Sequence, residues 1–256
     1  MKIVAFVPND GEEILFGLLT DNDRINVIGD PYLDGEIEET GRSYLRSDVV
    51  LVNPAFPSKA LCIGLNYADH AREFGLPVPK SPVVFMKPSS ALAGPDDYII
   101  KPSQCSQLDQ EAELCFVIGK ECRNVEESEA GDYILGYCCA NDVTARDLQP
   151  KDGQWTIAKG FDTFLPLGPY ISDEVDPSDL SIECRINGRT VQKSSTSNLI
   201  FSVPRLVSYL SKCMTLSPGD VILTGTPSGT THMNVGDVVE VEIEGLGTLR
   251  NTVDSL

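Results

Sequence analysis

Residues 108–119 of this chain, LDQEAELCFVIG, place two acidic side chains in an otherwise apolar stretch, and this conflict limits how the chain can fold. The stretch alternates as a β-strand does, so Ala112 and Leu114 face one way while Glu111 and Glu113 face the other. Neighbouring carboxylates repel each other, and burial of an unpaired one is costly. A divalent cation that prefers oxygen ligands (Mg²⁺, Mn²⁺ or Ca²⁺) would remove the conflict. The alternative is an exposed strand whose acids point into water, and alternation alone does not distinguish the two.

The composition argues against several kinds of partner. The chain of 256 residues has 38 acidic and 20 basic side chains, which give a net charge of −18. Such a surface repels the phosphates of nucleic acids, so we expect no nucleic-acid partner. No apolar run approaches the roughly eighteen residues that a membrane span needs, so we expect no membrane association. The chain starts with a strand and a turn instead of a signal or transit segment, which predicts a cytoplasmic location.

The cysteines and one lysine fit ordinary packing and solvation. The eight cysteines form no Cys-x-x-Cys pair, and the two histidines lie far from most of them, so we expect no zinc site. Reduced thiols packed in the core of a cytoplasmic protein are the simpler interpretation, including the adjacent pair Cys138 and Cys139. Lys87 ends a short apolar strand and precedes a proline. It could face a site, but we expect it to be solvated.

The chain is expected to form two domains. The alternating apolar runs and turn residues within residues 1–52 predict a small N-terminal β-rich domain. Two prolines at positions 54 and 57 then favour an extended linker. The strands expected in the first domain cover residues 2–7, 14–19 and 24–28. In the second domain, residues 53–256, Asn187-Gly188 predicts a type I′ hairpin turn, and residues 203–213 have helical spacing. The expected fold class is therefore mainly β with short helices (α+β).

A possible catalytic base lies just after the linker, within residues 60–77. Asn66 is placed to cap a helix of two turns that stops at Gly75. His70 and Glu73 are three residues apart, so they share one face of that helix and can form a hydrogen bond. A carboxylate that holds one imidazole nitrogen makes the other a better base, as activation of a water requires. An isolated His-x-x-Glu pattern, however, favours a surface ion pair over this catalytic arrangement.

Further polar residues follow buried segments in the second half of the chain. Asp142 comes directly after an apolar strand, where a third metal ligand is often found, and Arg146 and Gln149 share a face if the turn continues as a helix. Lys159 lies among apolar neighbours, and a lysine so placed often points its ammonium group at a carboxylate. Thr226 lies in a glycine-rich turn whose hydroxyl and backbone N–H groups can approach an anion.

In this order the motifs resemble those of the fumarylacetoacetate hydrolase family, over about residues 55–256. The matching segments are Ile63-Gly64-Leu65-Asn66-Tyr67-x-x-His70, Glu111-x-Glu113-Leu114, Asn141-Asp142-Val143-Thr144-Ala145-Arg146-Asp147, Lys159-Gly160-Phe161-Asp162 and Gly219-Asp220-x-Ile222-x-Thr224-Gly225-Thr226-Pro227-Ser228-Gly229. Each motif is weak by itself, but five in the order of the family are highly specific. The resemblance implies a catalytic domain with the family's β-roll, a homodimer, and one bound Mg²⁺ (or Mn²⁺ or Ca²⁺).

The resemblance also implies a role for each matching residue. The metal ligands would be Glu111, Glu113 and Asp142; the catalytic residues would be His70, Glu73 and Lys159; and the substrate would be bound by Tyr67, Arg146, Gln149 and Thr226. Full-length members of the family have a fourth carboxylate where this chain has Asn66, and their histidine pairs with an acid that matches Glu240. The small acylpyruvase-like members use an acid that matches Glu73, and this chain resembles them more closely.

The resemblance implies an enzyme that acts on a small anionic dicarbonyl substrate. The reaction expected first is hydrolysis of a C–C bond of an acylpyruvate-type acid, in which the cation stabilises an enolate and His70 activates water. Decarboxylation of oxaloacetate and keto–enol isomerisation of a 2-hydroxymuconate-type acid are the alternatives at the same site. A cation-binding β-protein without catalysis is a third and weaker interpretation.

Overall fold

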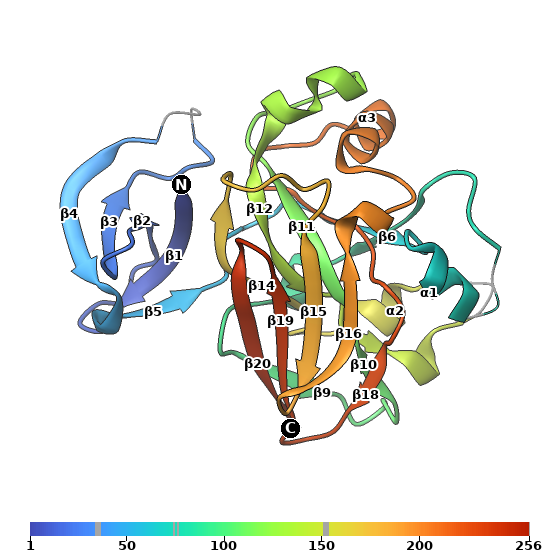
Figure 1. Cartoon of the computed structure of the whole chain (residues 1–256). Helices are drawn as coiled ribbons and strands as arrows, with labels where there is room; N and C mark the ends of the chain where they lie inside the picture. Colours follow the sequence, from blue (N-terminus) through green and yellow to red (C-terminus); the bar gives the residue numbers. More distant parts are fainter. Residues whose placement is uncertain (34–36, 74, 76, 151–153, 256) are drawn as a thin grey trace.

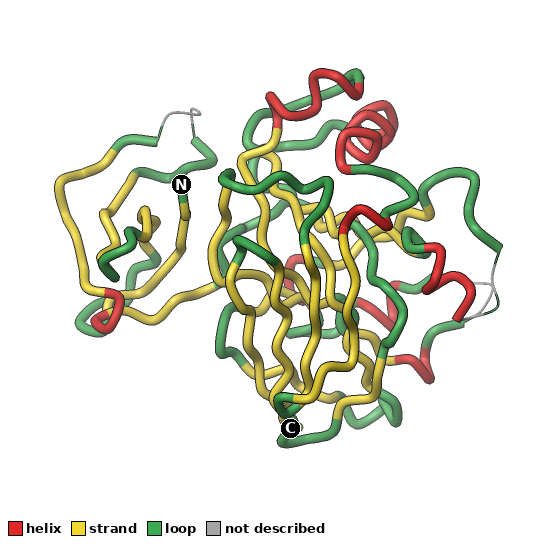
Figure 2. The backbone as a smooth tube through the Cα atoms, viewed as in Figure 1, coloured by secondary structure: helices red, strands yellow, loops and turns green. Residues whose placement is uncertain are grey.

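In the part of the chain that the structure describes, the strands form three β-sheets. A few short helices accompany them (Figures 1 and 2). The computed structural model describes residues 1–33, 37–73, 75, 77–150 and 154–255. Mainly β structure with short helices is the fold class that the sequence predicted. Among the described residues, no helix is long and apolar enough to cross a membrane.

The largest sheet has twelve strands and runs from the N-terminal region through the centre of the molecule. Its main path has the order β4-β3-β2-β1-β14-β12-β11-β17-β6-β7, with β5 paired to β1 and β8 paired to β14. The bounds of these strands are β1 Lys2–Pro8, β2 Leu15–Leu19, β3 Arg24–Ile28, β4 Glu39–Leu45, β5 Val49–Val52, β6 Ala60–Gly64, β7 Val83–Lys87, β8 Leu92–Ala93, β11 Ala112–Ile118, β12 Ile134–Asn141, β14 Leu165–Ser172 and β17 Val221–Leu223.

Two smaller sheets complete the β structure. A five-stranded sheet has the order β16-β15-β19-β20-β9, and a three-stranded sheet has the order β13-β10-β18. Their bounds are β9 Tyr98–Lys101, β10 Leu108–Gln110, β13 Thr144–Ala145, β15 Ser181–Ile186, β16 Arg189–Ser195, β18 Thr231–Met233, β19 Val238–Ile243 and β20 Gly247–Ser255. The five-stranded sheet packs on the large one, with β20 against β14, β19 against β12 and β15 against β11 (Figure 1). Most of the apolar core lies between these two sheets.

The helices are short and lie around the sheets (Figure 2). The α-helices are α1 Ala68–Glu73, α2 Thr156–Lys159 and α3 Val203–Cys213, and the 3₁₀ turns cover Arg46–Asp48, Ser89–Ala91, Glu127–Tyr133, Arg146–Leu148 and Thr196–Asn198. The helix predicted at residues 203–213 is confirmed, with proline in its first turn and an apolar face that includes Leu206 and Leu210 packed on the core. The predicted hairpin is also confirmed, because Asn187 and Gly188 both have positive φ between β15 and β16.

The N-terminal strands have a small apolar core of their own. Six buried side chains form it, and all of them come from residues 1–52: Val4, Phe6, Ile25, Val27, Val49 and Leu51. The three strands predicted in this region correspond to β1, β2 and β3. Strand β1 also pairs with β14 and so joins this region to the central sheet. The division of the chain at residue 52 stays a prediction.

Asn66 has a different role from the predicted helix cap, and that prediction is wrong. Its side chain is buried and links three backbone groups: it accepts a hydrogen bond from the N–H of Phe201 at 2.7 Å and donates to the carbonyls of Phe201 and Thr224 at 3.0 and 2.7 Å. In the first turn of helix α1, the carboxylate of Asp69 instead accepts a hydrogen bond from the N–H of His70 at 2.8 Å. The asparagine therefore fixes the segment before the helix to α3 and β17.

Candidate active site

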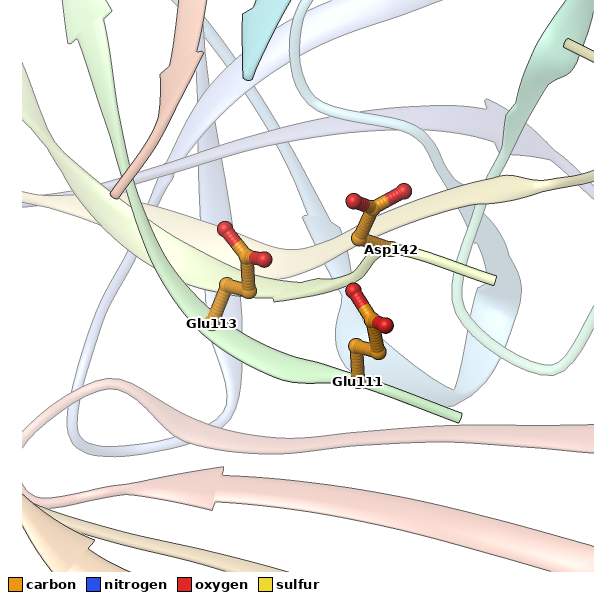
Figure 3. A group of neighbouring side chains, drawn as sticks. All are labelled: Glu111, Glu113 and Asp142. Carbon is orange, nitrogen blue, oxygen red and sulfur yellow. The ribbon is translucent and has the colours of Figure 1, made fainter. Parts of the chain in front are cut away.

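Three carboxylates from neighbouring strands converge in the centre of the molecule. Glu111 directly precedes β11, Glu113 is the second residue of that strand, and Asp142 directly follows β12 (Figure 3). The two strands pair so that Ala112 faces Asn141. One ligand oxygen from each acid lies within 4.8 Å of the others. Their exposed fractions are 4%, 2% and 1% respectively, so the interpretation of an exposed acidic strand is wrong. Both faces of β11 are buried because the five-stranded sheet covers one side and the site's own side chains cover the other.

Two buried lysines contact these acids. The ammonium of Lys159 lies 2.7 Å from Glu111 Oε2 and 2.7 Å from Asp142 Oδ2, as the sequence predicted for a lysine in apolar surroundings. Lys87 lies 2.7 Å from Asp142 Oδ1, and it donates to three backbone carbonyls at 2.6 to 2.9 Å. The prediction that Lys87 is solvated is wrong, because β7 directs this side chain inward, where it is 1% exposed. Burial lowers the pKa of Lys87, and Asp142 opposes that effect.

Arg146 and Gln149 also converge on the acidic cluster. The Arg146 guanidinium donates to Gln149 Oε1 at 2.6 Å and pairs with Glu111, as expected for two residues on one face of the 3₁₀ turn. It also donates through Nε to Asp109 Oδ2 at 2.8 Å. Asp109 is 3% exposed and was not singled out from the sequence, although it lies two residues before Glu111.

His70 is a buried residue of α1 and has an oriented ring. Its Nδ1 lies 3.2 Å from Glu73 Oε2, and the carboxylate of Glu73 also accepts from the N–H of Gly229 at 3.1 Å. His70 is 6% exposed and lines the same cavity as the acids, so the interpretation of a surface ion pair is wrong. Glu240 lies on β19 and pairs with Arg185 at 3.3 Å. Glu73 is therefore the acidic partner of His70.

Thr226 reaches the site, whereas Tyr67 does not line the cavity. The hydroxyl of Thr226 accepts from Gln192 Nε2 at 2.8 Å, and Gln192 also accepts from the N–H of Ala112 at 3.0 Å. This glutamine comes from the hairpin strand β16 and was not predicted, because no local pattern connects it to β11. Tyr67 is fully buried, and its hydroxyl has no hydrogen-bond partner among the described residues.

These groups surround a cavity of about 540 Å³. Its polar lining consists of His70, Glu111, Glu113, Asp142, Arg146, Gln149, Lys159 and Thr226. Among the described residues, the rest of the wall is apolar or glycine: Ile63, Gly64, Leu65, Gly75, Phe85, Pro150 and Trp155. The sequence analysis marked the three wall residues of the first motif, and Gly75 only as the end of the helix. It marked none of the others, since apolar side chains carry no recognisable spacing when they come from separate segments.

The charges of the cluster fit a hard divalent cation. Burial would raise the pKa of Glu111, but Lys159 and Arg146 lower it below its usual range. In contrast, burial together with Asp142 and Glu111 raises the pKa of Glu113. No lysine or arginine of the described segments forms an ion pair with Glu113, which accepts instead from the N–H of Gly225 at 2.6 Å. A cation held by the three acids would compensate this repulsion with ligands of the type that Mg²⁺ and Mn²⁺ prefer.

A buried cluster of oxygen ligands beside an oriented histidine defines the class of the protein as an enzyme, and comparisons with known proteins identify the family. The profile of the fumarylacetoacetate (FAA) hydrolase C-terminal domain matches residues 59–254. The mitochondrial oxaloacetate tautomerase of Xenopus laevis is 46% identical over 81% of this chain and 69% of its own length. This chain belongs to the fumarylacetoacetate hydrolase family, as its motifs predicted.

Two solved structures are similar over the whole chain. The 5-carboxymethyl-2-hydroxymuconate delta-isomerase from Mycobacterium smegmatis is 42% identical, with a TM-score of 0.92 and full coverage of both chains. The maleylpyruvate hydrolase from Sphingobium sp. SYK-6, in complex with manganese(II) and pyruvate, is 28% identical, with a TM-score of 0.81 and coverage of 100% and 99%. The family thus contains tautomerases, isomerases and hydrolases.

Proposed function

We propose that this enzyme catalyses keto–enol tautomerisation of a short 2-oxo acid that carries a second carbonyl or carboxylate at C4, as oxaloacetate does. The contact between Glu73 and His70 carries this proposal, because it orients a base that lines the same cavity as the acidic cluster. The relative named as an oxaloacetate tautomerase and the solved isomerase support this reaction type. It needs only proton transfer by the oriented base, without an attacking water or cleavage of a C–C bond.

In this mechanism His70 removes a proton from C3 of the keto acid, and the electron pair of that C–H bond forms the C2–C3 double bond of the enol. Glu73 holds Nδ1 of the ring at 3.2 Å, so the imidazolium that forms is stabilised by a carboxylate. The imidazolium of His70 then returns this proton to the C2 oxygen, which restores the free base, and the reverse sequence converts enol to ketone. A bound divalent cation would supply positive charge for the developing enolate oxygen. The buried position of His70 keeps its ring from bulk water.

The charge balance of the site explains how an acidic protein could hold an anion. Four carboxylates (Asp109, Glu111, Glu113 and Asp142) face three cationic side chains (Lys87, Arg146 and Lys159). The cluster is therefore anionic by itself and would repel a carboxylate substrate. With a divalent cation it becomes cationic by one charge, which favours a substrate carboxylate. We propose Mg²⁺ or Mn²⁺ as the ion, because both accept oxygen-only ligands.

Hydrolysis of an acylpyruvate is the second candidate. The same pair of His70 and Glu73 can take a proton from water, and the water then attacks the C4 carbonyl. The solved maleylpyruvate hydrolase, whose structure matches this chain along its whole length, supports this alternative. Decarboxylation of oxaloacetate needs no attacking water and remains a third outcome of the same assay. We also propose the homodimer and the cytoplasmic location expected from the sequence; light scattering in solution measures the first.

A panel of substrates tests the proposal. Purified enzyme with Mg²⁺ or Mn²⁺, and with chelator, is given enol oxaloacetate, 2,4-dioxopentanoate and a hydroxymuconate, and enol absorbance, pyruvate and CO₂ are followed separately. We expect metal-dependent loss of enol absorbance that Glu73→Gln slows at least tenfold. Glu240→Gln is the matched control, because Glu240 pairs with Arg185 within the five-stranded sheet. The Glu240→Gln variant should retain activity. Turnover that persists in Glu73→Gln would contradict the proposed base.

A further inference from the structure

The cavity has a charged side and an apolar side that meet at Lys159. The ammonium of this lysine contacts the acids on one side, and on the other it lies 5.2 Å from the centre of the Phe85 ring. Phe85 packs edge-on against Trp155, with ring centres 5.1 Å apart and ring planes at 73°. Ile63, Leu65 and Pro150 continue this apolar lining. A bound molecule with its carboxylate at the acidic cluster would therefore extend along aromatic and aliphatic side chains.

A glycine creates room for the aromatic wall. A Cβ atom on Gly64 would lie 2.6 Å from Cζ3 and 2.9 Å from Cη2 of Trp155, closer than real carbon contacts allow. The φ angle of Gly64 is not in the positive range, so the glycine is required here for space and not for backbone conformation. Any larger residue at this position would displace the indole from its contact with Phe85.

The size and the chemistry of the wall disfavour a second charged end on the substrate. A cavity of about 540 Å³ lies in the range of roughly 300–1,000 Å³ that encloses drug-sized ligands, so a four-carbon diacid leaves most of it empty. The Lys159 ammonium lies near Phe85, but it already pairs with Glu111 and Asp142. A second carboxylate placed against Phe85 and Trp155 would therefore lose hydration beside a cation that two acids already neutralise. An apolar group in the same place would gain from burial, at about fourfold in affinity for each methylene.

We infer that the preferred substrate is a 2,4-dioxo acid whose C4 acyl group carries an apolar tail, aryl or branched alkyl, seated against the edge-on pair of Phe85 and Trp155. This inference rests on the proposed function for the reacting end of the substrate and adds the chemistry of the other end. Edge-on packing of aromatic rings favours an aryl tail, because a third ring can continue the same arrangement.

A substrate series tests the inference. The values of kcat/KM are measured with Mg²⁺ for oxaloacetate, 2,4-dioxopentanoate, 2,4-dioxoheptanoate and 4-phenyl-2,4-dioxobutanoate. We expect the phenyl compound to exceed 2,4-dioxopentanoate by tenfold or more, and the propyl compound to lie between them. The ratio of kcat/KM for the phenyl compound to kcat/KM for 2,4-dioxopentanoate should fall toward one in each of three variants: Phe85→Ala, Trp155→Ala and Gly64→Ala. Met86→Ala and Ile157→Ala are the matched controls, because both side chains are exposed neighbours of the wall residues and do not line the cavity; they should keep the ratio.

A binding measurement separates this inference from the proposed function. Trp155 is the single tryptophan of the chain, so its fluorescence reports directly on the wall. Addition of 2-oxo-4-phenylbutanoate should shift the emission of Trp155. This compound should bind at least tenfold more tightly than 2-oxobutanoate, whether or not turnover occurs. Turnover of short acids with no preference for the phenyl group in either measurement would overturn the inference and leave the proposed function intact. Tight, tail-dependent binding without turnover of any compound would overturn the proposed function alone.

Discussion

Ser228 Oγ donates a hydrogen bond to Asp69 Oδ2 at 3.0 Å and thereby ties the turn after β17 to helix α1. The other oxygen of the same carboxylate accepts from the N–H of His70 at 2.8 Å, and the next residue of the turn, Gly229, donates to Glu73. The turn thus holds both ends of a helix of six residues, which is too short to be stable by itself. The position of the histidine ring depends on these contacts.

The first prediction concerns Ser228→Ala, which removes one of the two ties of α1. One hydrogen bond to a charged group is worth about 1.5–3 kcal/mol, so we expect kcat/KM to fall about tenfold or more as the ordered form of α1 becomes less populated. Amide hydrogen exchange in residues 68–73 should become faster, while exchange in the central strands stays the same. Ser228→Thr keeps the hydroxyl and should restore both measurements. Unaltered exchange in the alanine variant would show that Ser228 does not hold the helix.

The second prediction concerns Glu113→Gln and binding of the cation. The amide can still accept the hydrogen bond from Gly225, but it removes one charge from three crowded acids. In the presence of chelator, the free energy of unfolding should stay the same or rise, because repulsion with Glu111 and Asp142 is removed.

With added Mn²⁺ the two proteins should behave differently. The native chain should gain about 2.7 kcal/mol when the ion is at a hundred times its dissociation constant, and the variant should gain much less. Thermal unfolding with and without chelator measures both effects. An equal gain in the two proteins would show that Glu113 does not bind the ion.

The third prediction concerns Lys87→Met, which leaves the length of the side chain but removes its charge. Asp142 would lose one of its two lysine contacts while still buried, and three backbone carbonyls would lose a donor. Breaking one partner of a buried ion pair costs about 3–5 kcal/mol. Urea unfolding in the presence of chelator should show a loss of that size.

Lys193→Met is the control for this measurement. Lys193 also pairs with an acid, Glu183 at 3.6 Å, but its side chain is 76% exposed. Such a pair contributes about 0–1 kcal/mol. Similar losses of stability in the two variants would show that the burial of Lys87 has no particular importance.

The fourth prediction concerns the thiols. All eight cysteines are free, seven are buried and Cys213 is exposed at the end of α3. Burial raises the pKa of the buried thiols such as Cys62 and Cys139, which further slows their reaction with a thiolate-specific reagent. One thiol per chain should therefore react rapidly in the native protein and eight after unfolding. Fast reaction of several thiols in the native protein, or a rapidly reacting thiol that persists in Cys213→Ser, would contradict this assignment.

The local patterns that the sequence contains were sufficient for several elements. The hairpin around Asn187, the helix at residues 203–213 and the first three strands depend on turn residues and on periodicity within a few residues. The contact between His70 and Glu73 was predictable for the same reason, because two side chains three residues apart in a helix are neighbours whatever surrounds them.

Other residues of the site depend on the order of strands in the sheet, which no local pattern reveals. Lys87 reaches Asp142 because β7 lies at the edge of a sheet whose path brings β6, β17, β11 and β12 side by side. Gln192 reaches Ala112 because the five-stranded sheet packs on the large one. Asn66 was misinterpreted because its spacing is that of a cap, whereas its partners lie more than a hundred residues away.

The sequence by itself determined the family, the acids and the base, since each depends on residue types at short spacing. It left open whether Glu111 and Glu113 face water or a buried site, because an alternating strand has the same pattern in both cases. Only the tertiary structure decided this question, by covering β11 on both faces and surrounding the acids with Lys159, Lys87 and Arg146. Burial is a property of what packs on a strand, and the packing partners of this strand come from distant parts of the chain.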